Sequence, residues 1–120
     1  MPRWPTKDYS DLPMPSETDR AWAAGFWDGE GSTSLKRAQR PNGPRHRRMY
    51  VSQKDTGPEL LDRFLSIVGV GIVKERGTRP GVWAWTAQDN ASTNRALAVM
   101  WPYLSSPKQT QARNCGYDPT

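Results

Sequence analysis

Apolar and polar residues follow two different periods along this chain, and the first of them predicts a helix near the start. Ser16 and Asp19 have the spacing of a capping box, in which side chains at a helix start bond to free backbone amides. An apolar run over residues 22–27 follows, and Gly29 and Gly31 come directly after it. Because glycine commonly ends helices, we expect the first helix to run from about Ser16 to about residue 28.

Beyond this helix the pattern changes to strict alternation, which is typical of strands. Residues 32–36 and 48–52 alternate in this way, so that Leu35, Met49 and Val51 fall on a core face. The opposite face receives polar side chains, namely Ser32, Ser34, Lys36, Arg48, Tyr50 and Ser52. The segment between the two runs is rich in turn-forming residues, so we expect a hairpin.

A second helix is predicted between Thr56 and Gly69. Thr56 and Glu59 have capping-box spacing, Pro58 suits a first helical turn, and Gly69 suits the C-terminal end. The apolar stripe of this helix comprises Leu60, Leu61, Phe64, Leu65 and Val68.

A second hairpin and a third helix come next. Residues 70–76 and 82–86 are β-prone runs on either side of a turn-forming segment. A helix then starts at Asp89 or Asn90 and ends near residues 101 and 102. Its buried side chains are expected to be Leu97, Met100, Trp101 and Leu104.

A short last helix, from Lys108 to about Arg113, follows an N-cap at Ser106. The order is therefore α-β-β-α-β-β-α-α, and the fold class is α+β. A chain of 120 residues is one domain, and its small size makes dimerisation plausible. We expect a Pro-rich N-terminal arm over residues 1–15, a folded domain over 16–113 and a C-terminal tail over 114–120.

Charge is segregated along the chain. Its 17 Lys and Arg residues exceed its 12 Asp and Glu residues, which gives a net charge of +5. Between Glu30 and Asp55 there is no acid, and the bases there are Lys36, Arg37, Arg40, Arg45, Arg47, Arg48 and Lys54. This asymmetry indicates a nucleic-acid surface. A solvated basic loop stays open as an alternative, because residues 40–45 also have turn composition.

Several classes of protein are excluded by composition. With one cysteine, Cys115, and one histidine, His46, the chain cannot form a zinc finger or a disulfide framework, and a catalytic triad would depend on His46 alone. We expect Cys115 to be a free thiol in the tail. No signal peptide opens the chain and no apolar run is long enough to span a membrane, so we expect a cytoplasmic, reducing setting. A composition rich in Arg, Trp, Ala and Pro favours a GC-rich bacterial or phage genome.

The end of the first helix combines small residues with groups that could bind a metal ion. Ala23, Ala24 and Gly25 are small enough to let a second helix approach closely. Asp28 and Glu30 alternate with two glycines, so that a carboxylate and backbone carbonyls extend past the helix end. Such oxygen ligands suit a divalent cation.

This segment resembles the signature of the LAGLIDADG homing endonucleases. Ala24, Gly25, Asp28 and Gly31 match the motif, and Glu30 stands at its second acid. The chain departs from the motif at Ala23, where a large aliphatic residue is usual, and carries Gly57 where some relatives have a basic residue. Three further stretches, residues 51–54, 70–77 and 101–109, are similar to the corresponding segments of single-motif members.

The resemblance implies an αββαββα fold with a four-stranded antiparallel saddle over DNA and an extra short C-terminal helix. It implies a homodimer, with Ala23, Ala24, Gly25 and Asp28 as structural motif and dimer-interface positions. Glu30, with the Gly29 carbonyl, would bind Mg²⁺ or Mn²⁺, and Gln53 and Lys108 would complete the catalytic site. Asp28 is usually structural in this motif. Such a dimer would make a staggered double-strand break in a long DNA target.

Strand alternation, together with the resemblance, selects the side chains that would contact DNA. Those on strands would reach base edges, and those at hairpin tips would bind phosphates. The set comprises Ser32, Ser34, Lys36, Arg37, Arg40, Arg45, His46, Arg47, Arg48, Tyr50, Ser52, Ile72, Lys74, Arg76 and Arg79.

Two other functions stay open. One is a nuclease-inactive descendant of the same fold that acts as an RNA maturase or a transcription regulator. The other is a generic basic interaction domain. The gene's setting, in a mobile intron, in an intein or as a free-standing reading frame, is also open, and so is the DNA target sequence.

Overall fold

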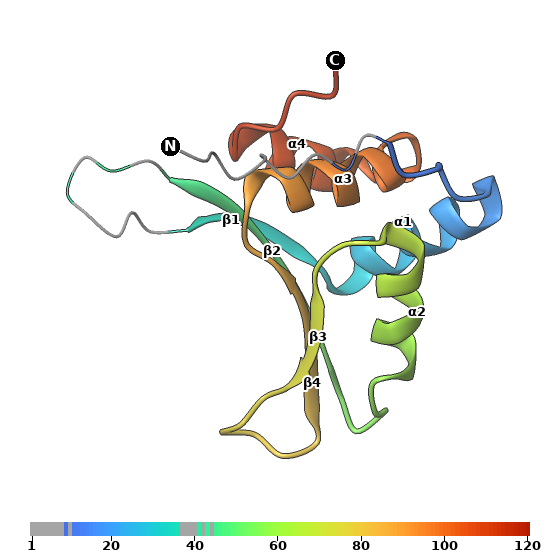
Figure 1. Ribbon diagram of the computed structural model, residues 1–120, viewed down its shortest axis with the longest axis vertical. Helices are drawn as coiled ribbons and strands as arrows, with labels where there is room; N and C mark the ends of the chain where they lie inside the picture. Colours follow the sequence, from blue (N-terminus) through green and yellow to red (C-terminus); the bar gives the residue numbers. More distant parts are fainter. Residues whose placement is uncertain (1–8, 10, 37–40, 42, 44) are drawn as a thin grey trace, which may run out of the picture.

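A computed structural model describes Tyr9, residues 11–36, Pro41, Gly43 and residues 45–120. The elements confirm the predicted order (Figure 1). They are α1 (Glu17–Glu30), β1 (Ser32–Lys36), β2 (His46–Lys54), α2 (Glu59–Val68), β3 (Ile72–Glu75), β4 (Val82–Ala87), α3 (Asn90–Met100), the 3₁₀ turn η1 (Trp101–Tyr103) and α4 (Ser106–Asn114).

The strands form one antiparallel sheet in the order β1-β2-β4-β3. One row of aligned residues crosses all four strands and runs from Ser32 through Tyr50 and Thr86 to Ile72. Figure 1 shows α1 and α2 on one side of the twisted sheet, while α3 and α4 pack near β1 and β2. The fold is therefore the α+β arrangement expected from the sequence.

Aromatic side chains from three elements form the centre of the core. Trp27 of α1 stacks on Phe64 of α2 with ring centroids 5.8 Å apart, and Phe64 meets Trp85 of β4 edge-on at 4.8 Å. The indole nitrogen of Trp85 donates a hydrogen bond of 2.9 Å to the Val70 carbonyl, so its polar group is satisfied inside the core. This cluster fixes α1 against the sheet.

Helix starts follow the capping signals in two of four cases. The Ser16 hydroxyl accepts from the Asp19 amide, and the Asp89 carboxylate accepts from the Ser92 amide at 2.7 Å. The capping box expected at Thr56 is wrong, because α2 begins after Pro58 without a side-chain cap. The turn ahead of it contains left-handed residues, which carry Thr56 away from the capping position. The N-cap expected at Ser106 is also wrong, because Ser106 is already the first residue of α4 and Ser105 is its N-cap.

The first helix is longer than expected, because Gly29 lies inside it and only Gly31 ends it. Gly31 has an extended backbone, with φ −87°, so a left-handed turn does not explain the glycine. A Cβ atom at Gly31 would overlap the Trp27 indole ring. Close packing against Trp27 therefore requires glycine at this position.

Burial differs from the expected pattern at three apolar positions. Leu35 is 41% exposed because it lies near the outer end of the edge strand β1, and Thr33 is buried in its place. Leu60 is 38% exposed because the buried stripe of α2 runs through Leu61, Phe64, Ile67 and Val68. Trp101 is only half-buried.

The residues after α4 pack against the rest of the chain. Tyr117 is buried, and its ring lies 4.9 Å from that of Trp101. The Cys115 thiol is free, as expected, but it is half-buried and contacts the Thr33 carbonyl at 3.6 Å. The helices in the described parts of the chain are all too short or too polar to cross a bilayer.

Candidate nucleic-acid interface and catalytic centre

The sheet face opposite the helices is lined with polar and basic side chains. The strand register confirms the predicted alternation, since Ser34 pairs with Arg48 and Lys36 with His46 on this face. Lys74 of β3 and Ser52 of β2 both align with Ala84 of β4. We call this set the open face; its described members are Ser32, Ser34, Lys36, His46, Arg48, Tyr50, Ser52, Lys54, Ile72, Lys74, Arg76, Val82, Ala84, Thr86 and Gln88.

No carboxylate belongs to the open face as defined by these described residues. Glu75 of β3 falls on the alternate register, and its carboxylate accepts from the Gly81 amide at 3.4 Å. Lys36 donates to the Gln88 side chain at 3.2 Å, a neutral partner. The open face therefore presents hydrogen-bond donors and positive charge, which suits a polyanion.

Arg47, predicted to contact DNA from a hairpin tip, does not lie there. It belongs to β2, points to the helix-covered side of the sheet and is only 5% exposed. Its guanidinium donates to the Thr93 hydroxyl at 3.0 Å and to Asn94. Because the strand starts at His46, alternation places Arg47 on the same face as Met49. The prediction was wrong because it placed Arg47 in the hairpin connection and not in the strand.

The other predicted phosphate contacts divide between exposed positions and positions outside the described residues. Arg45 and Arg79 are exposed in the two connections between strands. Arg37 and Arg40 lie outside the described residues.

The end of α1 brings Lys108 beside the motif. Glu30 is the exposed last residue of α1, and the following Gly31 is buried on the Trp27 ring. Lys108 of α4 donates from its ammonium group to the Gly31 carbonyl. Lys108 is therefore fixed at the residue that follows Glu30, although 77 positions separate Lys108 from Gly31.

A second contact holds α4 in this position. The Asp28 carboxylate accepts from the Ser105 amide at 3.1 Å and from the Ser105 hydroxyl at 2.9 Å. Ser105 is the N-cap of α4, and its own hydroxyl makes no capping bond. Gln111 of α4 also accepts from the Thr33 amide at 2.9 Å. These bonds are what a structural role of Asp28 would require, whereas the roles of Ser105 and Gln111 left no signal in the sequence.

The structure is similar to several DNA-bound nucleases. One is the homing endonuclease I-CvuI with the I-CreI target, at TM-score 0.70 and 22% identity, covering 82% of this chain and 64% of that one. Another is the group I intron-encoded I-CeuI with DNA, at TM-score 0.69 and 14% identity, covering 88% and 55%. A third is the LAGLIDADG enzyme I-GzeII with its DNA target, at TM-score 0.70 and 19% identity, covering 88% and 36%.

The chain has the fold of the LAGLIDADG homing endonucleases. It spans less than two thirds of the length of I-CvuI and of I-CeuI. No protein-family model matches the sequence, and no curated protein matches it significantly.

The small residues of the LAGLIDADG-like segment divide between the core and the surface of α1. Ala23 and Ala24, expected at a dimer interface, are fully buried within the chain's own core. The free surface is a different stripe at helical spacing, formed by Ala21, Gly25 and Gly29. A Cβ atom at Gly25 or Gly29 would meet no atom within 4 Å. Among these three predicted positions, Gly25 is therefore the one that is exposed and free to contact a partner.

Gln53, the third predicted member of the LAGLIDADG-type catalytic set, lies in β2 opposite Trp83 and is half-buried. Asp28 is hydrogen-bonded to Ser105, and Lys108 to the Gly31 carbonyl, but among the described residues no bond of this kind joins Gln53 to any of them. Of the three predicted groups, Lys108 bonds to the backbone of the residue after Glu30, whereas Gln53 makes no bond at this turn.

The oxygen atoms at the end of α1 fit a hard divalent cation. Glu30 supplies an exposed carboxylate, and the Gly29 carbonyl lies beyond the last intrahelical bond, which joins the Gly31 amide to Trp27. Only one carboxylate comes from this turn, and the described residues hold no group of three His, Cys, Asp or Glu that could bind a metal. I-CvuI was crystallised with DNA in 2 mM Mg and in 2 mM Ca.

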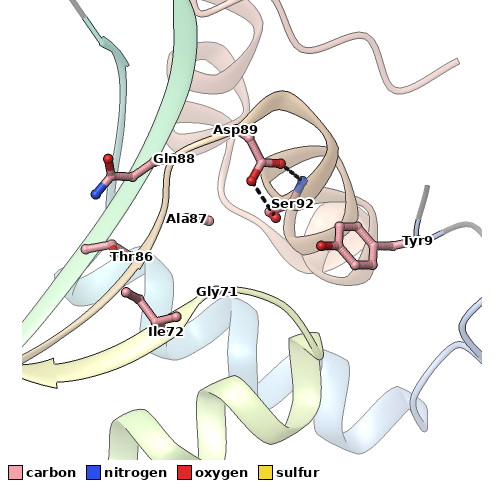
Figure 2. Close-up of a pocket in the computed structure, with 8 residues that line it drawn as sticks. All are labelled: Tyr9, Gly71, Ile72, Thr86, Ala87, Gln88, Asp89 and Ser92. Carbon is pink, nitrogen blue, oxygen red and sulfur yellow. Dashed lines mark hydrogen bonds between the residues drawn. The ribbon is translucent and has the colours of Figure 1, made fainter. Parts of the chain in front are cut away.

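A pocket of about 300 Å³ lies where β3 begins and β4 leads into α3 (Figure 2). Its lining includes Tyr9, Ile72 and Asp89. Figure 2 shows the Asp89 carboxylate bonded to both the amide and the hydroxyl of Ser92, at 2.7 and 3.0 Å. Because that carboxylate is already used as a helix cap, the pocket has no free acid for catalysis.

Proposed function

We propose that this chain is a site-specific homing endonuclease that acts as a homodimer and makes a metal-dependent, staggered double-strand break in a long DNA target. The observation that carries the proposal is the bond from Lys108 to the Gly31 carbonyl, which places Lys108 at the residue that follows Glu30. This pair lies where α1 leads into β1, the first strand of the acid-free open face.

The open face supplies DNA binding. Its basic side chains lie on strands, and a two-stranded ribbon or sheet can enter the major groove. The exposed Arg45 and Arg79 suit phosphate contacts that set the register of the protein on the duplex. Affinity should therefore fall steeply with salt, with a slope of about −0.9 in log K per neutralised phosphate.

At the catalytic centre, Glu30 and the Gly29 carbonyl would hold Mg²⁺ or Mn²⁺ together with oxygen atoms of DNA and water. Such an ion, when bound, supplies Lewis-acid polarisation of the scissile phosphate and of a nucleophilic water. Lys108 would stabilise the negative charge that develops on the phosphate and on the leaving oxygen. Gln53 would orient water near the same phosphate.

Two copies of the chain are needed, because one turn provides one carboxylate and cuts one strand. The exposed stripe of Ala21, Gly25 and Gly29 lets a second α1 approach closely, as small residues do at tight helix crossings. A twofold dimer about this stripe would bring two Glu30 residues together, one for each strand.

The first experiment is cleavage of a plasmid that carries the DNA flanking this gene's insertion point, with Mg²⁺ or with EDTA. We expect a single break that requires Mg²⁺. Glu30→Gln should lower the rate by on the order of 10²–10³-fold while leaving DNA affinity intact, because the metal-binding charge is lost. Glu17→Gln, at the exposed opposite end of α1, is the matched control and should cut normally.

Three results would contradict the proposal in different ways. If Glu30→Gln cuts at the parental rate, the catalytic role assigned to Glu30 is wrong. If the protein cuts in EDTA, the proposed metal dependence is wrong. Tight, salt-sensitive binding without a cut would instead favour a regulator or a maturase on the same fold.

A further inference from the structure

Tyr50 is flanked by two arginines at the centre of the open face. The Arg48 guanidinium lies 5.2 Å from the centre of the Tyr50 ring, and that of Arg76 lies 5.6 Å from it. Arg76 also donates to the Tyr50 hydroxyl. We call these three residues the Arg–Tyr–Arg cluster. It joins β2 to the end of β3 across the intervening strand β4.

A groove of about 290 Å³ lies at this cluster. Both arginines line it together with Tyr50, Lys74, Glu75 and Ala84. Ala84 is the residue of β4 that aligns with Lys74, and its side chain is short enough to keep the groove open. The groove is therefore surrounded by three cations, an aromatic ring and one carboxylate.

The cluster has donors without acceptors. Among the described residues, Arg48 and Arg76 have no carboxylate partner, and the Arg48 Nε atom is shielded from solvent without a hydrogen-bond acceptor. A buried donor left unsatisfied destabilises a protein. A shift of the Arg48 side chain toward a bound molecule would expose this donor to an acceptor, so the arrangement favours a ligand rich in acceptors.

We infer that the Arg–Tyr–Arg cluster reads guanine in the major groove of the DNA target. This inference rests on the proposed function. Guanine presents two acceptors, N7 and O6, at the spacing that a guanidinium contacts with two bonds. Stacking on Tyr50 and the bond to its hydroxyl hold the guanidinium groups in place before DNA arrives, which reduces the entropy lost on binding.

Position and charge favour a base over a phosphate as the contact. Arg48 lies within β2, and Arg76 pairs with β4 directly after β3, whereas phosphate contacts are expected from hairpin tips such as Arg79. Glu75, whose carboxylate also lines the groove, lies on the alternate register and accepts from the Gly81 amide at 3.4 Å, so this acceptor is already engaged and not free for cytosine N4. The contacted strand of each half-site should therefore be enriched in guanine near the cluster.

The test is selection of bound sequences from a library of randomised half-sites, in Mg²⁺-free buffer so that no DNA is cut. The parental protein should enrich guanine at one or more fixed positions in each half-site. Arg76→Gln should move the preference at one of these positions toward adenine, because an amide pairs with adenine N6 and N7. It should also weaken binding to the parental sequence by about 5- to 150-fold.

Two further variants distinguish base recognition by the cluster from a general effect of positive charge on DNA affinity. Arg79→Gln also removes one exposed positive charge, and it should weaken binding to all sequences alike without changing the selected bases. Tyr50→Phe keeps the ring and removes only the hydroxyl that accepts from Arg76, so it should weaken the guanine preference at that position. Circular dichroism would check that each variant is folded.

The outcomes distinguish this inference from the proposed function. Selective binding without guanine enrichment, or an unchanged preference in Arg76→Gln, would overturn the inference and leave the endonuclease proposal standing. Failure of the parental protein to bind any DNA would overturn both.

Discussion

Arg47 is a buried cation whose hydrogen bonds hold separate parts of the fold together. Besides Thr93 and Asn94, its guanidinium donates to the backbone carbonyls of Asn90 and Cys115, both at 3.4 Å, and lies over the Tyr117 ring at 5.6 Å. Burial lowers the pKa of Arg47, while Cys115 and Tyr117 partly oppose that shift. One side chain therefore joins β2 to the start of α3 and to the residues after α4.

The first prediction follows from these bonds. Arg47→Ala should lower the free energy of unfolding by about 2–4 kcal/mol, because several buried acceptors lose their donor at once. The measurement is urea denaturation followed by circular dichroism. Arg45→Ala, two residues earlier and exposed, should change stability by no more than about 0.5 kcal/mol. Equal effects of the two substitutions would show that Arg47 is not a structural residue.

The neighbours of Arg47 predict a loss of stability in alkali. Burial raises the pKa of the Cys115 thiol above its ordinary value of 9.0 and that of the Tyr117 hydroxyl above 10.0, with Arg47 partly opposing both shifts. Asp118 adds to the raised pKa of Tyr117. Above about pH 9 the unfolded chain releases protons that the folded chain keeps, so the folded state binds more protons and its stability falls as pH rises.

Unfolding by urea at about pH 8 and about pH 10 measures this effect. The parental protein should lose stability between the two values. The double variant Cys115→Ser, Tyr117→Phe removes both titrating groups and keeps the ring packed on Trp101, so its loss should be smaller. An identical loss in both proteins would assign the alkaline instability to other groups.

At the scale of elements, the junction between α1 and α4 positions the two residues proposed for catalysis, Glu30 and Lys108. Asp28 precedes Glu30 by two residues on α1, and Ser105 precedes Lys108 by three on α4. The bonds from Ser105 to Asp28 therefore fix the start of α4 while Lys108 reaches Gly31. The two helices act as one unit, although 77 positions separate their bonded residues.

Asp28→Ala should weaken this junction. We expect a loss of about 1–2 kcal/mol in stability, because the amide and hydroxyl of Ser105 lose their acceptor. Cleavage should fall by on the order of 10- to 100-fold, because Lys108 is no longer held in place. Asp28→Asn keeps an oxygen acceptor and should restore part of both losses. Asp62→Ala, on the exposed side of α2, is the control.

A structural role alone would predict a different pattern. If Asp28 contributed only stability, cleavage measured well below the unfolding temperature would match that of the parental protein. If it bound the metal directly, Asn would not rescue cleavage, and the affinity for Mg²⁺ would fall.

The sequence predicted the order of elements well and their contacts poorly, for a physical reason. Local periodicity is enough to place β1, β2 and α2, because alternation and helical spacing are properties of neighbouring residues. The partners of Asp28 and Arg47 lie more than 40 positions away, so no local pattern indicates them. Lys108 was found through a resemblance to a family motif, while Ser105, which holds its helix in place, was not.

At the scale of the whole molecule, one side of α1 packs in the core of the chain, and the stripe on its outer side is the surface proposed for dimerisation. Ala23, Ala24 and Trp27 face the core, and Ala21, Gly25 and Gly29 face outward. Half-buried Trp22 and Phe26 stack on each other beside this stripe, with rings 5.4 Å apart, and Arg63 of α2 lies 4.0 Å from the Trp22 ring. Small residues with an aromatic border are what a close helix crossing requires.

Glycine inside an exposed helix destabilises a single chain, so the outward position of Gly25 calls for a partner to explain it. Gly25→Leu should therefore raise the stability of the isolated chain by about 0.5–1 kcal/mol, since leucine is the better helix former and meets no atom within 4 Å. The same side chain should separate two α1 helices and abolish the dimer and double-strand cleavage. Thr110→Leu, exposed on α4, should leave both unchanged. Analytical ultracentrifugation measures the dimer, and a thermal melt measures stability. A stabilised Gly25→Leu variant that stays fully dimeric would place the interface on another surface.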